Sequence, residues 1–386
     1  MRKALFTIAL VLASAILPAQ EKIALKHGPY LQNLTGTEVT IVWIASSNSV
    51  GWVELAPDDG SNFYDTERPK FWDARNGIKT EGRVHTVKLT GLKPGTTYRY
   101  RAFAQEVLEH KGNVVLYGKI AAGNVYTKKP LSFTTCDPSK TSVSFAMVND
   151  IHGKNDRLRT LLSQCDFSKT DQVMMVGDMA SMFNSEDQVF GDFMDTAVEI
   201  FASETPMYYT RGNHETRGAI AYHFQDYFSP KSEHIYYMFR QGPVVFVALD
   251  CGEDKPDSDI EYFGANVYDE YRSEQAEWLK KIVQTEEYKS APFKIVTCHM
   301  PPLSNWHGEL DLQEKWLPIL NEADVDVMLC GHHHKLIHKN AGEVAAFPVI
   351  ANSNDTILKG EATSSKLTLV ITDESGKKVD ELIIRK

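Results

Sequence analysis

Short runs of alternating apolar and polar residues fill the first third of the chain. Residues 39–44 and 85–92 alternate in this way, and turn-forming clusters such as Lys93-Pro94-Gly95 separate the runs. A period of two places apolar side chains on one face of a strand, and short strands with regular turn signals are typical of an antiparallel sandwich. The pattern therefore predicts a small all-β domain over residues 22–135.

From residue 142 onward, solidly apolar runs alternate with amphipathic stretches. Such runs indicate strands buried on both faces, and the stretches between them indicate covering helices. We expect helices over residues 155–165, 186–202 and 273–287, with Ser273 capping the last one, and a closing hairpin around Ser375-Gly376. Residues 142–386 are therefore predicted to form an α/β domain.

Residues 1–19 have the layout of a secretory signal peptide. A short basic segment precedes an apolar run over residues 5–17, and Pro18-Ala19 stands where a small-residue cleavage site belongs. The run is too short to span a bilayer comfortably, and no later segment is long enough for a membrane helix. We expect an exported protein, periplasmic or extracellular, with no transmembrane segment in the mature chain. An N-terminal anchor or a buried strand is the alternative.

Composition narrows the class of protein further. The chain has 386 residues, 42% of them hydrophobic and 24% charged, which is typical of globular domains and excludes a disordered chain. A formal net charge of −10 leaves no basic footprint for nucleic-acid binding. The five cysteines are too few and odd in number for a disulfide scaffold, and Cys298 and Cys330 are interpreted as buried thiols.

The candidate chemistry lies where five apolar runs end. Each of these runs is followed by His, Asp or Asn, at the position where parallel strands of α/β sheets deliver ligand-binding residues. Gathering such polar side chains in one place is costly unless a cation neutralises them, so the pattern favours a metal site. The five endings are Asn149-Asp150-Ile151-His152, Gly177-Asp178, Arg211-Gly212-Asn213-His214-Glu215, His299-Met300-Pro301-Pro302 and Gly331-His332-His333-His334.

Each ending also has a purely structural interpretation. Gly-Asp after a strand is common in turns, Asn213 could be a helix N-cap, and the tract 332–334 could lie on the surface. If the tract is extended, His332 and His334 face one way and His333 the other. The joint occurrence of five endings, in order and each after a buried-strand pattern, favours the metal site.

In order, the endings resemble the five blocks of the calcineurin-like metallophosphoesterase superfamily: Asp-x-His, Gly-Asp, Gly-Asn-His-Glu, a single His and Gly-His-x-His. The resemblance covers about the last two thirds of the chain and implies a β-sandwich flanked by helices. It also implies two metal ions and assigns their ligands. By this assignment Asp150, His152 and His334 bind one ion, Asn213, His299 and His332 bind the other, and Asp178 bridges both.

The first third carries a second resemblance. Gly28-Pro29-Tyr30-Leu31-Gln32 followed by Val39-Thr40-Ile41-Val42-Trp43 is similar to the sandwich domain that precedes purple acid phosphatase catalytic domains. Residues 92–100, Leu-Lys-Pro-Gly-Thr-Thr-Tyr-Arg-Tyr, resemble the tyrosine corner of fibronectin type III domains. The two resemblances together imply a multidomain, purple acid phosphatase-like protein.

One position departs from the purple enzymes. They have a tyrosinate ligand three residues after the bridging Asp, and here that position is Ser181, while the first block carries His152. Replacing a tyrosinate with a neutral imidazole weakens the preference for ferric iron, so Fe, Mn and Zn remain open as the two divalent or mixed-valence ions.

The ligand set predicts hydrolysis of a phosphorylated small molecule. Two ions clamp the phosphoryl oxygens and supply a metal-bound hydroxide that attacks phosphorus, here in phosphomonoesters. His214 is predicted to stabilise developing charge or protonate the leaving group, with a core histidine bonded to Glu215 as the alternative. His307 is the other candidate acid, because residues 299–307 resemble the leaving-group loop of purple acid phosphatases.

Several alternatives stay open at this stage. Arg211 and Arg217 flank the third ending and either bind phosphate or lie exposed on the surface. The same metal site would also serve a phosphodiesterase or nucleotidase, and Phe183, Tyr222, Tyr262 and Trp306 either stack on a base or pack. A non-catalytic surface binding protein with a degenerate catalytic domain is a third function, disfavoured because all seven predicted ligands are present.

Overall fold

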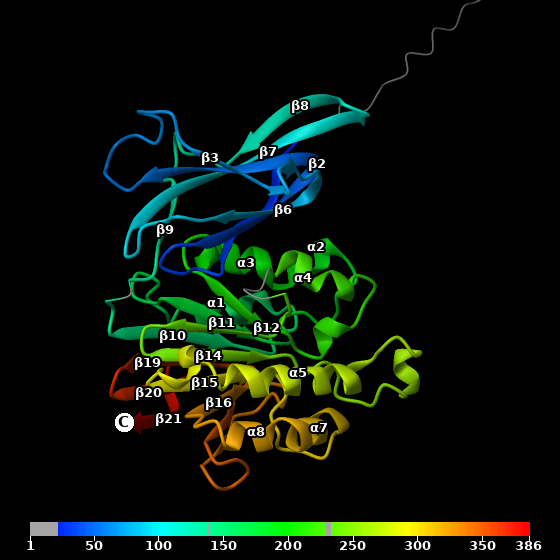
Figure 1. Cartoon of the computed structure of the whole chain (residues 1–386), viewed down its shortest axis with the longest axis vertical. Coiled ribbons are helices and arrows are strands. Elements are labelled where there is room, and N and C mark those ends of the chain that lie inside the picture. The colour runs from blue at the N-terminus through cyan, green and yellow to red at the C-terminus, as the bar shows by residue number, and fades with distance from the viewer. Residues whose placement is uncertain (1–21, 138, 229–232) are drawn as a thin grey trace, which may run out of the picture.

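The computed structural model describes residues 22–137, 139–228 and 233–386, with a β-rich N-terminal domain above a larger α/β domain in Figure 1. The predicted signal peptide, residues 1–19, lies outside the described residues. Within the described ranges, no helix is long and apolar enough to cross a membrane.

The N-terminal domain is the β-rich unit that the alternation predicts. The long strand β2 pairs with β1 and β6 mainly through its first half, and with β3 and β7 through its second half, so the antiparallel sheet folds over a core that includes Trp43, Tyr100 and Phe133. The Tyr98 hydroxyl accepts a 2.9 Å hydrogen bond from the Lys93 amide, as a tyrosine corner requires. The strands are β1 (Leu25–Gln32), β2 (Val39–Pro57), β3 (Lys70–Trp72), β4 (Ala74–Arg75), β5 (Ile78–Lys79), β6 (Gly82–Leu89), β7 (Thr97–Lys111), β8 (Val114–Ala122) and β9 (Leu131–Thr134).

The second domain is built on two six-stranded sheets. The first runs in the order β12-β11-β10-β19-β20-β21 and the second in the order β13-β14-β15-β16-β18-β17. Apolar side chains from both sheets, among them Phe145, Phe246 and Leu329, form one buried cluster between them. The strands are β10 (Ser142–Val148), β11 (Gln172–Val176), β12 (Met207–Thr210), β13 (Tyr237–Gln241), β14 (Val244–Leu249), β15 (Phe293–Cys298), β16 (Val327–Cys330), β17 (Ile337–Lys339), β18 (Val349–Ala351), β19 (Thr356–Thr363), β20 (Lys366–Asp373) and β21 (Lys378–Arg385).

Helices cover the outer face of each sheet. Those up to residue 228 pack on the first sheet and those from residue 268 pack on the second, each forming its own apolar cluster. The expected architecture, a β-sandwich flanked by helices, is confirmed. The helices are α1 (Asn155–Leu162), α2 (Glu186–Val189), η1 (Phe190–Met194), α3 (Asp195–Ala197), η2 (Val198–Ala202), η3 (His214–Thr216), η4 (Ala221–His223), α4 (Phe224–Tyr227), η5 (Ile260–Tyr262), α5 (Tyr268–Ile282), α6 (Glu286–Lys289), α7 (His307–Lys315) and α8 (Leu317–Asn321).

All three predicted helices are present, but α1 ends at Leu162, and the predicted helix over residues 273–287 ends at Ile282 and is followed by the separate helix α6. Residues 186–202 are helical throughout, with two π-helical turns, and β20 and β21 form the expected closing hairpin. The third helix, however, begins at Tyr268, and the Ser273 hydroxyl bonds the carbonyl of Asp269 inside it, so the predicted cap at Ser273 is wrong. The backbone N–H groups of Tyr268 and Asp269 instead donate to the carboxylate of Asp257, which lies eleven residues before the helix and outside the local window of a capping pattern.

The two domains share a packed interface. Tyr30, Val42 and Ile44 of the N-terminal domain belong to the apolar cluster on the outer face of the first sheet of the second domain. Two tyrosines cross this interface, because the Tyr30 hydroxyl donates to the carbonyl of Tyr227 and the Tyr100 hydroxyl to that of Ser203, both at 2.7 Å. The N-terminal domain therefore packs against the helices of the second domain.

Candidate metal centre

The five endings meet at one edge of the molecule. Strands β10, β11 and β12 are parallel neighbours in the first sheet, and β15 and β16 are parallel neighbours in the second. Their carboxyl ends therefore face one another across the sandwich. The seven predicted ligands come from both sheets: Asp150, His152, Asp178 and Asn213 from the first, and His299, His332 and His334 from the second.

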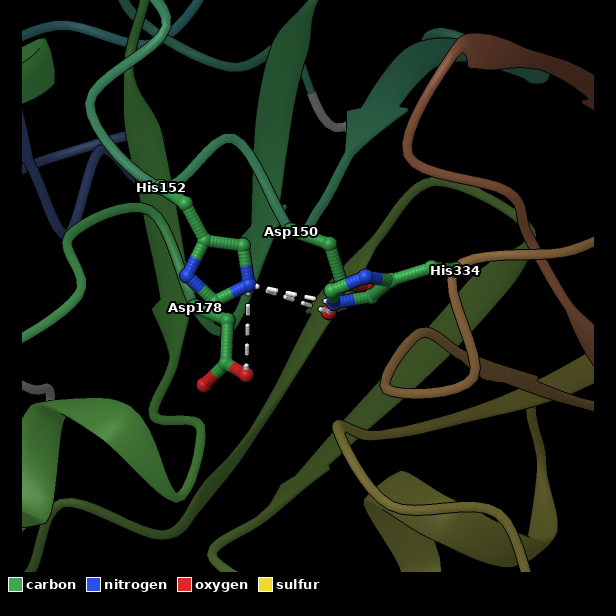
Figure 2. A group of neighbouring side chains, drawn as sticks. All are labelled: Asp150, His152, Asp178 and His334. Carbon is green, nitrogen blue, oxygen red and sulfur yellow. Dashed lines mark hydrogen bonds and ion pairs between the residues drawn. The ribbon is translucent and has the colours of Figure 1, made fainter.

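One group of side chains gathers around Asp150. The ligand atoms of Asp150, His152, Asp178 and His334 all lie within 4.8 Å of one another (Figure 2). His334 Nε2 is 3.1 Å from Asp150 Oδ1 and 3.1 Å from His152 Nε2. The arrangement is the one predicted for the first ion, with Asp178 on the side toward the second.

A second group shares Asp178 with the first. Ligand atoms of Asp178, His299 and His332 lie within 4.8 Å of one another, and His299 Nε2 is 3.0 Å from Asp178 Oδ2. Nδ1 of His299 donates to the carbonyl of Val176 at 2.8 Å, which leaves Nε2 turned toward the carboxylates. Asp178 is therefore the common member of both groups, and the assignment of Asn213 to the second ion stays a prediction.

The backbone at these positions is unusual. Five of the seven predicted ligands have left-handed φ angles between 49° and 73°: Asp150, His152, Asp178, His332 and His334. Such angles are uncommon in residues other than glycine, and they cluster where function holds the chain in a strained conformation. The left-handed turns direct the side chains inward after each strand, so the 332–334 tract lies in a loop and is not extended. The alternation of faces expected for an extended tract therefore does not apply, since Nε2 of His333 and Nε2 of His332 lie 3.1 and 3.9 Å from the same oxygen of Glu309 and the two rings are 5.4 Å apart.

Two glycines make room for the ligands. A Cβ on Gly177 would lie 2.3 Å from Nδ1 of His299, and one on Gly331 would lie 2.5 Å from Oδ2 of Asp150. Neither distance is tolerated by a packed side chain. Glycine is therefore required for steric reasons at both positions, before Asp178 and before His332.

The polar atoms of this cluster fit a bound cation. Asp150 Oδ1, Asn213 Oδ1 and His299 Nε2 are buried without a hydrogen bond in the described part of the chain. Buried polar atoms are normally satisfied, so exceptions that converge on one place indicate a partner that is not protein. Carboxylate, amide and imidazole donors together suit Fe, Mn or Zn.

Burial and charge perturb the protonation of these groups. Burial lowers the pKa of His152 and of His332 to about 4, which favours the neutral imidazole that metals bind. Burial opposes the charged forms of both Asp178 and His299, but their mutual attraction prevails, lowering the pKa of Asp178 and raising that of His299. Without a cation, a protonated imidazole of His299 balances the negative charge of the Asp178 carboxylate.

Glu215 organises the site although sequence reasoning gave it no role of its own. Its carboxylate is fully buried and accepts hydrogen bonds from the N–H groups of Asp178, Met179 and Gly212 at 2.9, 2.7 and 2.9 Å. Ala180 and the Tyr209 hydroxyl also donate to it. Burial raises the pKa of Glu215. The carboxylate thereby ties the loop after β11 to the loop after β12.

Glu309 has the corresponding role on the second sheet. One carboxylate oxygen accepts from the N–H groups of Leu303 and Ser304, and the other lies 3.1 Å from Nε2 of His333. Trp306, half exposed, packs its ring 5.0 Å from that of His332. The sequence signal for Glu309 was weak, because an acidic residue in the first turn of a helix is ordinary.

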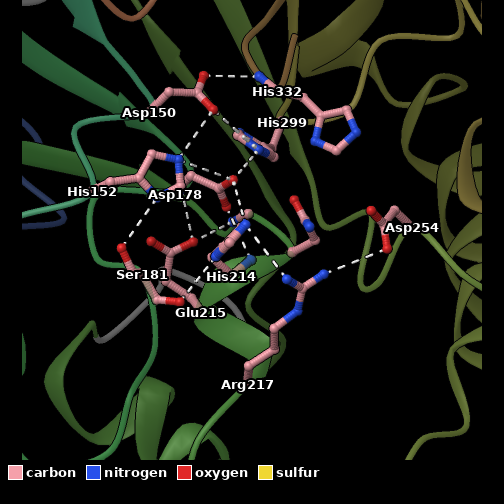
Figure 3. Close-up of polar contacts among 12 residues, drawn as sticks. Asp150, His152, Asp178, Ser181, His214, Glu215, Arg217, Asp254, His299 and His332 are labelled. Atoms are coloured by element: carbon pink, nitrogen blue, oxygen red, sulfur yellow. Dashed lines mark hydrogen bonds and ion pairs between the residues drawn. The ribbon is translucent and has the colours of Figure 1, made fainter. Parts of the chain in front are cut away.

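His214 lies beside the shared Asp178, with its ring 4.8 Å from that of His152, and it is not a buried core histidine. Its Nδ1 is 2.9 Å from the carbonyl of Ser181, which can only accept a hydrogen bond and so fixes the tautomer with Nδ1 protonated. Its Nε2 then faces Asp178 Oδ2 at 3.9 Å and Nη1 of Arg217 at 3.4 Å (Figure 3). Glu215 is not among its hydrogen-bond partners in the described residues, so the alternative interpretation of His214 is wrong.

The two arginines of the third ending are both paired. Arg211 is buried and holds Asp250 with Nε at 3.2 Å and Nη2 at 2.8 Å, and Arg217 makes a bidentate contact with Glu253 at 2.6 and 2.8 Å. Asp250 and Glu253 follow strand β14. The sequence contained a sign of these acidic partners, because β14 is a sixth apolar run and acidic residues follow it.

His307 begins helix α7 and points elsewhere. Its Nε2 bonds Asp269 Oδ1 of α5 at 2.7 Å, and in the described residues none of the seven predicted ligands is its polar partner. Its role as an acid stays a prediction. Of the four aromatic residues considered, Phe183 is fully buried and packs in the core, whereas Tyr222 is 79% exposed. The hydroxyl of Tyr262 donates to Glu253, and Trp306 contacts the metal cluster as described above.

Two Asp/His groups that share one carboxylate, set at the edge of two packed sheets, define a metallophosphoesterase site. Residues 143–336 match the family Calcineurin-like phosphoesterase, which is half of the chain. The chain belongs to this family. Strands β19 to β21 lie beyond the match but complete the first sheet, since β19 pairs with β10. Residues 29–135 match the Purple acid Phosphatase, N-terminal domain.

Curated relatives are similar at low identity. Probable purple acid phosphatase 20 of Arabidopsis thaliana is 23% identical over 314 residues, covering 74% of this chain and 64% of that protein. Purple acid phosphatase 22 of the same plant is 28% identical over 270 residues, 66% of this chain and 53% of that protein. Uncharacterized protein Rv2577 of Mycobacterium tuberculosis is 25% identical, covering 69% and 52%. The chain spans about half to two thirds of the length of these relatives.

Proposed function

We propose that the protein is an exported, dinuclear-metal phosphatase that hydrolyses phosphomonoesters. The observation that carries the proposal is the pair of Asp/His groups sharing Asp178, with buried atoms on Asp150, Asn213 and His299 that make no hydrogen bond within the described residues. The names of the plant relatives support a phosphatase, and the sequence pattern of residues 1–19 supports export.

The chain's own residues divide the work in this proposal. Asp150, His152 and His334 would hold one ion, Asn213, His299 and His332 the other, and Asp178 both. When bound, such a pair lowers the pKa of water and neutralises phosphoryl charge. Glu215 and Glu309 fix the loops that carry these ligands, through the backbone hydrogen bonds described above.

His214 is the proposed partner of the phosphoryl or leaving group. The carbonyl of Ser181 keeps its Nδ1 protonated and orients Nε2 toward the shared carboxylate. Nε2 is therefore the atom that would carry a proton toward the substrate or stabilise its charge. Ser181 Oγ lies 3.5 Å from Nδ1 of His152, so the position of the purple enzymes' tyrosinate is occupied by a neutral hydroxyl next to a histidine.

A substrate panel tests the proposal. Metal-stripped enzyme is reloaded with Mn, Zn or Fe and offered a nitrophenyl phosphomonoester, the corresponding diester and nucleotides. The expected result is metal-dependent turnover with the highest kcat/KM on monoesters. Faster turnover of the diester would overturn the monoesterase assignment, and turnover by enzyme shown to be metal-free would overturn the metal mechanism.

Variants at the two histidines separate their roles. His214→Ala is expected to keep both metals and to lose roughly 10²–10⁴ in kcat. If His214 protonates the leaving group, the loss is large for alkyl phosphates and small for nitrophenyl phosphate. If it stabilises charge on phosphorus, both substrates lose equally. His307→Ala is the matched comparison, and full activity of both variants on alkyl phosphates would show that another group supplies the proton.

A further inference from the structure

Another group of metal-ligating side chains lies at the interface between the two domains. Ligand atoms of His27, Glu186 and Asp187 all lie within 4.8 Å of one another. His27 belongs to β1 of the N-terminal domain, whereas both carboxylates belong to α2, the helix that lies directly below that domain in Figure 1. An ion bound by all three side chains would therefore connect the two domains.

The imidazole of His27 is held in the way that a metal-binding imidazole is held. Its ring stacks on that of Phe190 with the ring centres 4.4 Å apart, and its Nδ1 lies 2.9 Å from Oδ1 of Asp195. An ionised carboxylate can only accept a hydrogen bond, so the proton is on Nδ1 and the lone pair is on Nε2. A histidine that binds a metal through one ring nitrogen commonly donates the other N–H to a carboxylate in this way.

Nε2 of His27 faces the carboxylates without a hydrogen bond. The residue is only 8% exposed, and its buried Nε2 makes no hydrogen bond within the described part of the chain. Nε2 lies 3.9 Å from Oδ1 of Asp187, which is too far for a hydrogen bond. Bonds from zinc to nitrogen and oxygen are about 2.0–2.2 Å long, so one ion can contact both atoms. His299 in the metal centre has the same combination of a bonded Nδ1 and an unpartnered Nε2.

The charges around His27 favour an added cation. Lys26 pairs with Asp187 and Arg83 pairs with Glu186, and the partner of the imidazole is a third carboxylate. Three carboxylates therefore stand against two cations, which leaves one negative charge unbalanced among these groups. The side chains of Lys26 and Arg83 are 35% and 42% exposed, so each can turn into solvent when an ion takes its place. The Asp187 side chain is 74% exposed, which opens a path for the ion.

We propose that His27, Glu186 and Asp187 form a structural zinc site that joins the two domains. One imidazole and two carboxylates suit zinc, and a water molecule completes its four-fold coordination. None of the three residues is among the seven predicted ligands of the metal centre, and the inference does not depend on the proposed function. Because the ligands come from both domains, zinc binds only when the domains are packed together, and it therefore stabilises their interface.

Counting the zinc ions bound by the protein tests the site. The whole protein is dialysed against Zn²⁺, and bound zinc is measured by metal analysis. The wild type is expected to bind one more ion per chain than Asp187→Asn and than His27→Gln. Asp187 is exposed, so Asp187→Asn decides the question even if His27→Gln does not fold. An equal number of ions in the wild type and Asp187→Asn would overturn the inference. Zinc at the Asp178 centre cancels in this comparison, because neither variant alters that centre.

Lys26→Gln tests the arrangement of charges in the opposite direction. Lys26 is a cation that competes with the ion for Asp187, so its removal should tighten binding of the additional zinc about tenfold, the scale of one nearby charge at a protein surface. Affinity that is unchanged or lower in Lys26→Gln would contradict the assignment of Asp187 as a ligand.

His338→Gln is the matched control. Nδ1 of His338 lies 2.7 Å from Oδ2 of Asp380, and its buried Nε2 is also without a hydrogen bond in the described residues. Unlike His27, it belongs to no group of three ligands in the ranges that the structure describes. The control should bind as many zinc ions as the wild type, and loss of an ion from it would contradict the assignment of the additional site to His27.

Discussion

Glu215→Gln is the most informative single change at the base of the site. The wild-type carboxylate is fully buried, and its two oxygens accept four backbone N–H groups and one tyrosine hydroxyl. Glutamine has nearly the same shape but replaces one oxygen with an NH₂ group, which can only donate. The substitution therefore removes acceptor capacity without opening a cavity.

The cost follows from the hydrogen bonds of each oxygen. Oε1 accepts from Met179, Ala180 and Tyr209, whereas Oε2 accepts from Asp178 and Gly212. Glutamine loses the fewest hydrogen bonds if its NH₂ group takes the place of Oε2. The buried N–H groups of Asp178 and Gly212 then face a donor instead of an acceptor. At about 1–3 kcal/mol for each unsatisfied group, the free energy of unfolding falls by about 2–6 kcal/mol.

Metal affinity should fall together with stability. The N–H of Asp178 and that of Gly212, next to Asn213, are held by the same oxygen, so both predicted metal groups lose their backbone support. Supporting contacts of this kind are worth roughly 10–100-fold in metal affinity. Urea unfolding of the metal-free protein measures the first effect, and metal titration measures the second. Glu287→Gln, at an exposed position, is the control. If Glu215→Gln matches that control in both measurements, the organising role of Glu215 is refuted.

Three further changes have defined outcomes. Chelation should abolish activity, and adding Mn, Zn or Fe should restore it, since hydroxide near neutral pH depends on the ions. If a chelated sample stays active, metal analysis of that sample shows whether ions are still bound. Iron-loaded protein should be colourless or pale in visible absorption because Ser181 cannot act as a tyrosinate, and a strong band in a variant lacking the nearby tyrosines would contradict the ligand assignment. Burial opposes ionisation of Glu309, but His333 and two backbone N–H groups lower its pKa below its ordinary value of about 4.3. Its stabilising contribution is therefore complete above that value and is lost as pH falls from it through the lower pKa of the folded state, so the free energy of unfolding of the metal-free wild type, measured in urea, should fall on acidification more steeply than that of Glu309→Gln.

The sequence alone determined the elements and the predicted metal ligands. Short apolar runs bounded by turn residues favour strands between covering layers, and a period of two distinguishes the N-terminal strands from them. The polar residues that follow each run mark strand ends, which is why Asp150, Asp178 and His299 could be named before any tertiary contact was known. The resemblance to the five blocks of the family then assigned each predicted ligand to one of the two ions.

Tertiary structure alone decided which groups support those ligands. Only long-range packing turns the carboxylate of Glu215 toward the N–H of Asp178 in another loop, and the same holds for the contact of Glu309 with His333, although Glu309 bonds the nearby N–H of Leu303 locally. His214 and His307 look alike in sequence, yet one faces Asp178 and the other bonds Asp269. The start of α5 depends in the same way on Asp257, eleven residues upstream. Local patterns encode periodicity and turns, whereas hydrogen bonds between distant loops depend on how the two sheets pack, and no local pattern carries that information.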